Sequence, residues 1–211
     1  MRAAGPGDVA GPPEEREVKL RVGADFVLPD LADDGATTIV DEGENLLVAV
    51  YWDTDGLDLA GAGVGLRHRN GTWTYKGRSR RDGDAVVREE REVEAADDAH
   101  LPDALLAMVG QSADPASVHP IATVRTRRRT LRLQRGDQSV EVVSDHVTVC
   151  DGDRPVATFS EVETEYSRDS QGLADRVVAR LVEAGAVVDG TAKVVRALRA
   201  LGHNPPEVWE R

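Results

Sequence analysis

The chain has 211 residues, of which 40% are hydrophobic and 30% charged, so it can bury a substantial core and has the composition of a soluble globular protein. Its net charge of −12 argues against binding to nucleic acid or to an anionic membrane, and an anionic ligand would need locally concentrated positive charge. Cys150 is the only cysteine, which excludes an internal disulfide and a thiolate metal cluster and is typical of a reducing cytosol. No apolar run reaches the roughly 18 residues of a membrane span, and no apolar signal region opens the sequence, so we expect a cytoplasmic protein.

The first segment, residues 1–13, is rich in glycine, alanine and proline and is expected to be a flexible lead-in. No linker divides the sequence that follows. Residues 14–202 are therefore expected to form a single domain, with residues 203–211 as a short tail.

Period-two alternation of charged and apolar residues recurs along this domain, and it is typical of β-strands with two different faces. Asn-Gly and Asp-Gly pairs favour tight hairpins between such strands because both tolerate positive φ, as at Asn70-Gly71 and Asp151-Gly152. The pattern predicts about eight strands, near residues 14–23, 45–54, 63–69, 72–77, 86–95, 121–135, 139–149 and 155–166.

Three segments have helical spacing instead. Residues 173–184 place Leu173, Val177 and Leu181 on one helix face. Residues 99–109 and 191–201 are the other two predicted helices, and Gly202 is a stop signal for the last one.

Charged residues recur on one face of strand after strand, in several separate groups. The ordinary interpretation of each is a solvated sheet face. A closed sheet could instead collect these faces in a polar interior, with Arg128 and Arg132 pointing outward. The groups are Glu15, Glu17, Lys19 and Arg21; Arg67 and Arg69; Arg125, Arg127 and Arg129; Glu141 and Asp145; and Glu161, Glu163 and Glu165. The second interpretation predicts a mainly β (α+β) fold, a closed eight-stranded antiparallel β-barrel tunnel with flanking and closing helices.

An interior of this kind suits a complex of a metal ion with a polyphosphate. Guanidinium and ammonium groups match phosphate oxygens. Carboxylates at positions i and i+2 of a strand point the same way and can share one hard cation, and Mg²⁺ is commonly held by carboxylates together with substrate phosphates. Hydrolysis would need an activated water and cationic stabilisation of the transferred phosphoryl group.

The sequence resembles the CYTH domain family, the triphosphate tunnel metalloenzymes, over about residues 14–202. The segment Glu15-Arg-Glu-Val-Lys19 is similar to the ExExK signature of that family. Further motifs follow in the family's order: Tyr51-Trp-Asp-Thr54 (YYDT), Leu66-Arg-His-Arg69 (LRxR), Lys76, Arg88-Glu-Glu-Arg-Glu92 (RxExE/N), Arg127, Glu141-Val-Val-Ser-Asp145 (ExxxD), Glu161-Val-Glu-Thr-Glu165 (ExExE) and Thr191-Ala-Lys-Val-Val-Arg-Ala-Leu198 (SKxxRAL). Thr191 replaces the usual serine, and the glycine expected after the ExxxD strand is missing around His146 and Val147.

The resemblance implies roles for individual residues and a Mg²⁺ or Mn²⁺ cofactor. Lys19, Glu163 and Glu165 are expected to be catalytic. Phosphate contacts are expected from Lys19, Arg67, Arg69, Lys76, Arg125, Arg127 and Lys193. The metal ligands are expected among Glu15, Glu17, Glu90, Glu92, Asp145, Glu161, Glu163 and Glu165.

The function expected on these grounds is metal-dependent hydrolysis of a small triphosphate, with inorganic tripolyphosphate favoured because no adenine pocket is evident. Hydrolysis of thiamine triphosphate or a nucleoside triphosphate, cyclisation of ATP, and non-catalytic polyphosphate binding are the alternatives. Neither a nucleic-acid partner nor a membrane partner is expected, and the protein is expected to be a monomer or a homodimer.

Overall fold

A computed structural model describes residues 15–32, 35–95 and 99–205, and Glu15 by its backbone alone. Eleven strands of these residues form a single antiparallel sheet, in the order β5 (Arg80–Asp82), β6 (Ala85–Arg88), β1 (Glu15–Val22), β10 (Arg154–Tyr166), β9 (Gln138–Asp151), β8 (His119–Arg135), β2 (Thr38–Asp53), β3 (Gly65–Arg69), β4 (Thr72–Lys76) and β7 (Glu90–Glu94), with β11 (Val187–Val188) added to β1. The mainly β architecture is thus confirmed, with more strands than the expected eight. The expected lead-in at 1–13 and most of the expected tail lie outside the described residues.

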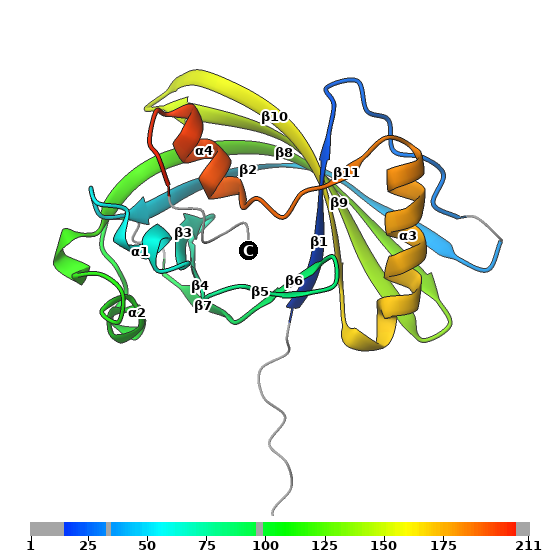
Figure 1. Cartoon of the computed structure of the whole chain (residues 1–211), viewed down its shortest axis with the longest axis horizontal. Helices are drawn as coiled ribbons and strands as arrows, with labels where there is room; N and C mark the ends of the chain where they lie inside the picture. The colour runs from blue at the N-terminus through cyan, green and yellow to red at the C-terminus, as the bar shows by residue number, and fades with distance from the viewer. Residues whose placement is uncertain (1–14, 33–34, 96–98, 206–211) are drawn as a thin grey trace, which may run out of the picture.

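The longest strands build a curved wall (Figure 1). Hairpin turns at Gly136 and Gly152 connect its last three strands, and their φ angles of 57° and 58° need a residue that tolerates the left-handed region. The expected strand 45–54 begins seven residues earlier, because its polar start continues the ladder through a bulge at Gly43. The wall consists of β2 (Thr38–Asp53), β8 (His119–Arg135), β9 (Gln138–Asp151) and β10 (Arg154–Tyr166).

Shorter strands complete the enclosure. The expected strand 86–95 is two strands divided at Glu89. Its first part pairs with β1 and its second part with β4, while Gly77 N donates to Glu89 O at 2.9 Å. The continuous chain through Glu89 therefore connects the two sides of the curled sheet where the ladder is interrupted. These strands are β1 (Glu15–Val22), β3 (Gly65–Arg69), β4 (Thr72–Lys76), β5 (Arg80–Asp82), β6 (Ala85–Arg88), β7 (Glu90–Glu94) and β11 (Val187–Val188).

The helices pack against apolar side chains of the sheet. The three expected helices are present, although the first begins only at Asp103, after Pro102, because proline disfavours helical geometry in the residue before it. The described helices are α1 (Asp58–Gly61), α2 (Asp103–Val109), α3 (Gln171–Glu183) and α4 (Lys193–Ala200), with short 3₁₀ turns at Pro115–Ser117 and Arg168–Ser170. None of the helices in the described ranges is long and apolar enough to cross a membrane.

Helices α3 and α4 cover opposite faces of the wall. Helix α3 packs with Leu20 and Leu133, which alternate with the charged residues of β1 and β8. Helix α4 packs through Ala197 and Leu198 against Val124, on the face that also carries Asp145 and Glu161. The wall's apolar residues therefore change face along its length, and charged residues remain on the inner face beside α4.

Candidate active site

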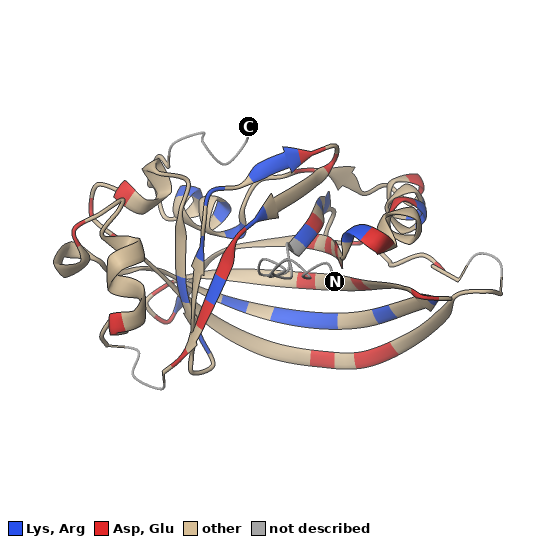
Figure 2. Cartoon of the chain, turned by 90° about the horizontal axis from the view of Figure 1, so that it is seen from below, with Lys and Arg blue, Asp and Glu red and all other residues tan. Residues whose placement is uncertain are grey.

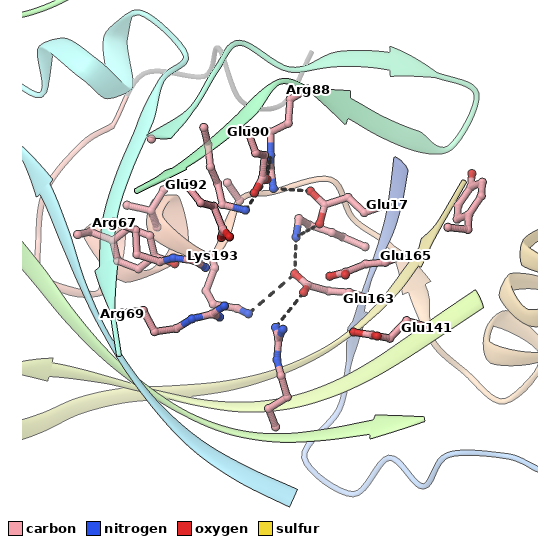
Figure 3. Close-up of a pocket in the computed structure, with 18 of the residues that line it drawn as sticks. Glu17, Arg67, Arg69, Arg88, Glu90, Glu92, Glu141, Glu163, Glu165 and Lys193 are labelled. Atoms are coloured by element: carbon pink, nitrogen blue, oxygen red, sulfur yellow. Dashed lines mark hydrogen bonds and ion pairs between the residues drawn. The ribbon is translucent and has the colours of Figure 1, made fainter. Parts of the chain in front are cut away.

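Charged side chains from the inner strand faces surround a cavity of about 670 Å³ (Figure 3). Seven basic and six acidic side chains line it. Sites for small organic molecules are lined mainly by apolar and aromatic groups, so this lining favours a highly charged ligand. The lining residues are Glu17, Lys19, Tyr51, Gly65, Arg67, Arg69, Lys76, Arg88, Glu90, Glu92, Arg128, Glu141, Glu163, Glu165, Tyr166, Ser167, Ala192, Lys193 and Val194.

Arg67 and Arg69 form the positive side of the cavity (Figure 3). They lie two residues apart on β3 and therefore point the same way. Arg67 Nη2 donates to Thr74 Oγ1 at 3.2 Å, and no carboxylate within the described ranges forms an ion pair with either guanidinium. Burial, together with the charges of Arg67 and Arg128, lowers the pKa of Arg69. Forked guanidinium donors of this kind match the oxygens of an anion such as phosphate.

Glu17, Glu163 and Glu165 form the first acidic cluster, on the opposite side of the cavity (Figure 3). One carboxylate oxygen of each lies within 4.8 Å of the others. The Lys19 ammonium lies beside the cluster and forms ion pairs with Glu163 and, at 2.8 Å, with Glu17 Oε2. Burial alone would lower the pKa of Lys19, but these carboxylates raise it overall, so the ammonium remains charged.

Glu90 connects two cations at the junction of β6 and β7. Its Oε1 lies 2.6 Å from Lys76 Nζ and 2.8 Å from Arg88 Nε, and Arg88 Nη2 also reaches Glu17 Oε1 at 2.6 Å. Burial opposes ionisation of Glu90, but Lys76 and Arg88 lower its pKa to about 2. Lys76 has a side chain that is 20% exposed, and its partial burial and repulsion by Arg88 and Arg67 outweigh the charges of Glu90 and Glu17, so its pKa falls to about 8.

Asp145, Glu161 and Glu163 form the second acidic cluster, which is deeper and shares Glu163 with the first. Arg128 donates two hydrogen bonds to the Asp145 carboxylate, of 2.9 and 2.6 Å, and a third to Glu163 Oε2 at 3.1 Å. Lys193 Nζ lies 2.6 Å from Asp145 Oδ2 and 2.9 Å from Glu161 Oε1. Arg128 and Lys193, both partly buried, thus contact this cluster, together with Lys19 at Glu163 and Arg196 at Glu161.

Arg125 and Arg127 were expected to contact phosphate, but the structure places both on the outer face of β8. Arg125 pairs with Asp153 at 2.7 Å, and Arg127 pairs with Glu44 at 3.1 Å. The prediction placed the odd-numbered residues of β8 inside. The inner face instead carries the even-numbered ones, in phase with Val124 and out of phase with Leu133, which packs with α3.

The same error affects Arg128, which was predicted to face outward and lies in the cavity. Arg132, also predicted to face outward, is exposed and does not line the cavity, and it pairs with Glu42 at 2.9 Å and with Glu141 at 3.0 Å. The apolar residues of β8 do not decide the face from sequence, because side chains two residues apart share a side of a strand and Val124 and Leu133 have opposite phases.

The sequence matches the family model of the CYTH domain over residues 14–185, which is most of the chain. The chain belongs to the CYTH family. A comparison with curated proteins finds no match.

Solved CYTH-like structures share the fold. A candidate adenylyl cyclase from Hippeastrum, described as having a dominant triphosphatase activity, superposes with a TM-score of 0.56 at 18% identity over 91% of this chain and 98% of the other. A candidate adenylate cyclase from Bacillus halodurans superposes with a TM-score of 0.56 at 16% identity over 85% of this chain and 95% of the other. At these identities the likeness shows the fold alone.

The other CYTH residues expected in the site have different surroundings. Glu92 lines the cavity in an exposed position, and Thr74 Oγ1 donates to it at 3.4 Å. The side chain of Glu15 lies outside the described part of the structure, although its backbone pairs with Arg88. Asp145 and Glu161, expected as metal ligands, are in contact with cationic side chains. Lys193, expected to bind phosphate, likewise contacts carboxylates.

Two residues of the YYDT-like motif have a structural role. The Asp53 carboxylate accepts hydrogen bonds from the backbone N–H groups of Thr54, Leu59 and Ala60, at 2.8 to 2.9 Å. Thr54 Oγ1 also donates to Asp58 Oδ2 at 2.7 Å. This motif fixes the turn that leads from β2 into α1.

The first acidic cluster fits a hard divalent cation better than the second does. Its donors are carboxylate oxygens, and Mg²⁺ binds such ligands at about 2.0–2.1 Å, so ligands on opposite sides of one ion lie about 4 Å apart. The spacing of 4.8 Å or less is compatible with that geometry. Glu165 is also the least buried of the three, which leaves the cluster open to the cavity.

Proposed function

We propose that this CYTH protein is a metal-dependent hydrolase of a small triphosphate and that inorganic tripolyphosphate is its substrate. The observation that carries the proposal is the division of one cavity into two sides. Arg67 and Arg69 face it without a carboxylate partner in the described chain, and the first acidic cluster faces it from across. An anion alone would be repelled by the acidic side, and a metal ion alone would be repelled by the basic side.

The basic residues would hold the triphosphate. Arg67 and Arg69 offer forked donors that match phosphate oxygens, and Lys76 adds a third cation at the same end of the cavity. Lys19 is proposed to be a fixed positive charge beside the reacting phosphate. It cannot act as a general base because its pKa is raised.

Glu17, Glu163 and Glu165 would hold Mg²⁺ or Mn²⁺. A bound ion of this kind lowers the pKa of a coordinated water and offsets charge on phosphate oxygens. Lys19 and Arg128 keep Glu163 in place, and Arg88 does the same for Glu17. In the reaction, water attacks a terminal phosphorus, the P–O bond to the bridging oxygen breaks, and orthophosphate and pyrophosphate leave.

Hydrolysis of the inorganic compound is favoured over cyclisation of ATP by the lining of the cavity. A cyclase must also hold an adenine base and a ribose, while the described lining is mostly ionic, with Tyr51 and Tyr166 as its only aromatic groups. The Hippeastrum neighbour, named as a candidate cyclase but described as dominantly a triphosphatase, points in the same direction.

The test is a substrate panel. Purified protein is incubated with Mg²⁺ or Mn²⁺ and with tripolyphosphate, ATP or thiamine triphosphate, and orthophosphate and cyclic AMP are measured. We expect the highest kcat/KM for orthophosphate release from tripolyphosphate and no cyclic AMP. Cyclic AMP as the main product from ATP would contradict the proposed hydrolase and support adenylate cyclase activity. A higher kcat/KM for thiamine triphosphate would contradict the proposal that inorganic tripolyphosphate is the substrate.

A further inference from the structure

A second cavity, of about 660 Å³, lies between α3 and the β5–β6 hairpin (Figure 1). Its volume is within the roughly 300–1,000 Å³ that is typical of small-molecule sites. Arg16 lines it, and this side chain points to the opposite face of β1 from Glu17 and Lys19 in the active site, because side chains alternate along a strand. The proposed hydrolysis does not use this groove.

Arg16 brings a buried guanidinium with unused hydrogen-bonding capacity to the groove. The residue is 4% exposed, and its Nη2 donates to Asp82 Oδ2 at 2.7 Å and to Gln171 Oε1 at 3.5 Å. Neither Nε nor Nη1 has a hydrogen-bond partner among the described residues. Most buried donors in folded proteins are satisfied, so these two favour an additional acceptor, and a carboxylate suits a guanidinium well.

The same groove has an excess of acidic side chains. Asp82, Asp84 and Asp175 line it, together with Arg16 as its single basic residue. Arg16 pairs with Asp82, and the other two carboxylates form no ion pair within the described ranges. They would repel a purely anionic ligand such as a triphosphate, while Arg16 would repel a simple cation.

Gln171 shows that the opposite charges lie close together. Its Oε1 accepts from Arg16 Nη2 at 3.5 Å, and its Nε2 donates to Asp175 Oδ1 at 2.7 Å. The guanidinium and this carboxylate are therefore separated by one side-chain amide and two hydrogen bonds. A ligand whose ammonium and carboxylate groups are neighbours, as in an α-amino acid, can contact both at once.

Apolar side chains line the remainder of the groove. Val178 and Val182 follow Asp175 along α3 at intervals of three and four residues, so the three share one helix face. Val18 and Val188 add apolar surface from β1 and β11, and Val182 is 44% exposed. Covering exposed apolar surface is favourable, so the groove suits an apolar group beside the two charges.

We propose that this groove is a second ligand site and that it binds a free amino acid with an apolar side chain. The carboxylate of the ligand accepts a hydrogen bond from an unpartnered N–H group of Arg16, and its ammonium group pairs with Asp175. Its side chain packs on Val178 and Val182. The site is independent of the proposed hydrolysis.

Isothermal titration calorimetry with L-leucine and two analogues tests the chemistry of the ligand. The analogue 4-methylpentanoate has the same carbon chain without the ammonium group, and 3-methylbutylamine lacks the carboxylate. We expect leucine to bind and each analogue to bind about 10- to 100-fold more weakly, because each loses one charged hydrogen bond. Absence of leucine binding, or an analogue that binds as tightly as leucine, would overturn the proposal.

Variants locate the site. Arg16→Met and Asp175→Asn should each weaken leucine binding by about 10- to 100-fold, because each removes one charged partner. Glu183→Gln is the control, since Glu183 is an exposed residue of α3 that does not line the groove, and it should leave leucine affinity unchanged. Asp175 is also exposed, so its variant serves as the test if Arg16→Met does not fold. Wild-type affinity in a folded Asp175→Asn variant would refute the assignment.

Tyr166 lines both this groove and the active-site cavity, so the two sites must be distinguished. Arg69→Ala alters only the active-site cavity and should leave leucine affinity unchanged. Loss of leucine binding in this variant would place leucine in the active site and overturn the proposal. Leucine binding is measured without turnover, so a protein that binds leucine and releases no orthophosphate would reject the hydrolase alone.

Discussion

Strand β8 carries neighbouring arginines that lie in opposite environments. Arg128 faces inward with an 18% exposed side chain and grips Asp145, whose side chain is fully buried. Arg127 faces outward with a 63% exposed side chain and pairs with Glu44, which is 52% exposed. Basic and acidic residues also run along neighbouring long strands in Figure 2, so charge alone does not distinguish the two faces.

The comparison shows that ion pairs of the same kind contribute differently to stability on the two faces of one sheet. Water and salt screen the outer pairs, which therefore contribute little. Inside, each charge has lost its hydration and depends on its partners. A charged ligand that enters the cavity can therefore replace existing ion pairs of the inner network.

The largest contrast is expected in stability. Arg128→Met removes the guanidinium that the buried carboxylates of Asp145 and Glu163 share. Loss of one partner of a buried pair costs up to about 3–5 kcal/mol, and Lys193 and Lys19 remain beside these carboxylates to offset part of it. The control Arg127→Met removes an exposed pair and should change the free energy of unfolding by less than about 0.5 kcal/mol. Urea unfolding of both variants measures the difference, and equal losses would refute the distinction between the faces.

Ligand binding should separate stability from function within the inner face. Arg67→Ala or Arg69→Ala removes a guanidinium without a described carboxylate partner, so the fold should be retained. A hydrogen bond to a charged group contributes about 1.5–3 kcal/mol, so tripolyphosphate affinity should fall about 10- to 100-fold. Isothermal titration calorimetry measures this, and wild-type affinity in both variants would remove these arginines from the site.

Lys76 should make binding dependent on pH in a defined window. Its pKa is lowered to about 8, so the ammonium is charged below that pH and neutral above it. A bound triphosphate favours the charged form and raises this pKa. Affinity should therefore decline as pH rises through 8, by at most about tenfold per pH unit.

Lys76→Met is the control for this effect, because comparison with it cancels the titration of tripolyphosphate itself. The ratio of the wild-type affinity to that of the variant should fall between pH 7 and 10. A constant ratio would show that Lys76 does not contribute its charge to binding.

The smallest effects are expected on the outer face. Arg125→Ala and Arg127→Ala should leave tripolyphosphate affinity within about twofold, because exposed ion pairs of this kind are screened and weakly coupled to the cavity. The same calorimetric titration serves as the measurement. A tenfold loss in either variant would restore the role that the sequence predicted for these arginines.

The sequence predicted the fold and the types of residue in the cavity better than it predicted their orientation. Alternation reveals which residues share a face, and it placed Arg67 with Arg69 and Glu163 with Glu165 correctly. It does not reveal which face is inside when both carry charges, and this caused the errors at Arg127 and Arg128.

Ion pairing was the other feature that the sequence could not supply. Asp145 and Lys193 are far apart in the chain, and their 2.6 Å contact depends on how α4 returns to the sheet. The pairing of Arg88 with Glu17 likewise depends on the register of β6 on β1. Such contacts follow from tertiary packing, and local periodicity carries no information about them.

The rate of orthophosphate release from tripolyphosphate by the wild type, with Mg²⁺ and then after excess EDTA, tests the central claim most directly. We predict turnover with the metal ion and its loss after chelation, with recovery when Mg²⁺ or Mn²⁺ is restored. Turnover that EDTA leaves unchanged would contradict the account, because the first acidic cluster would then have no metal to hold.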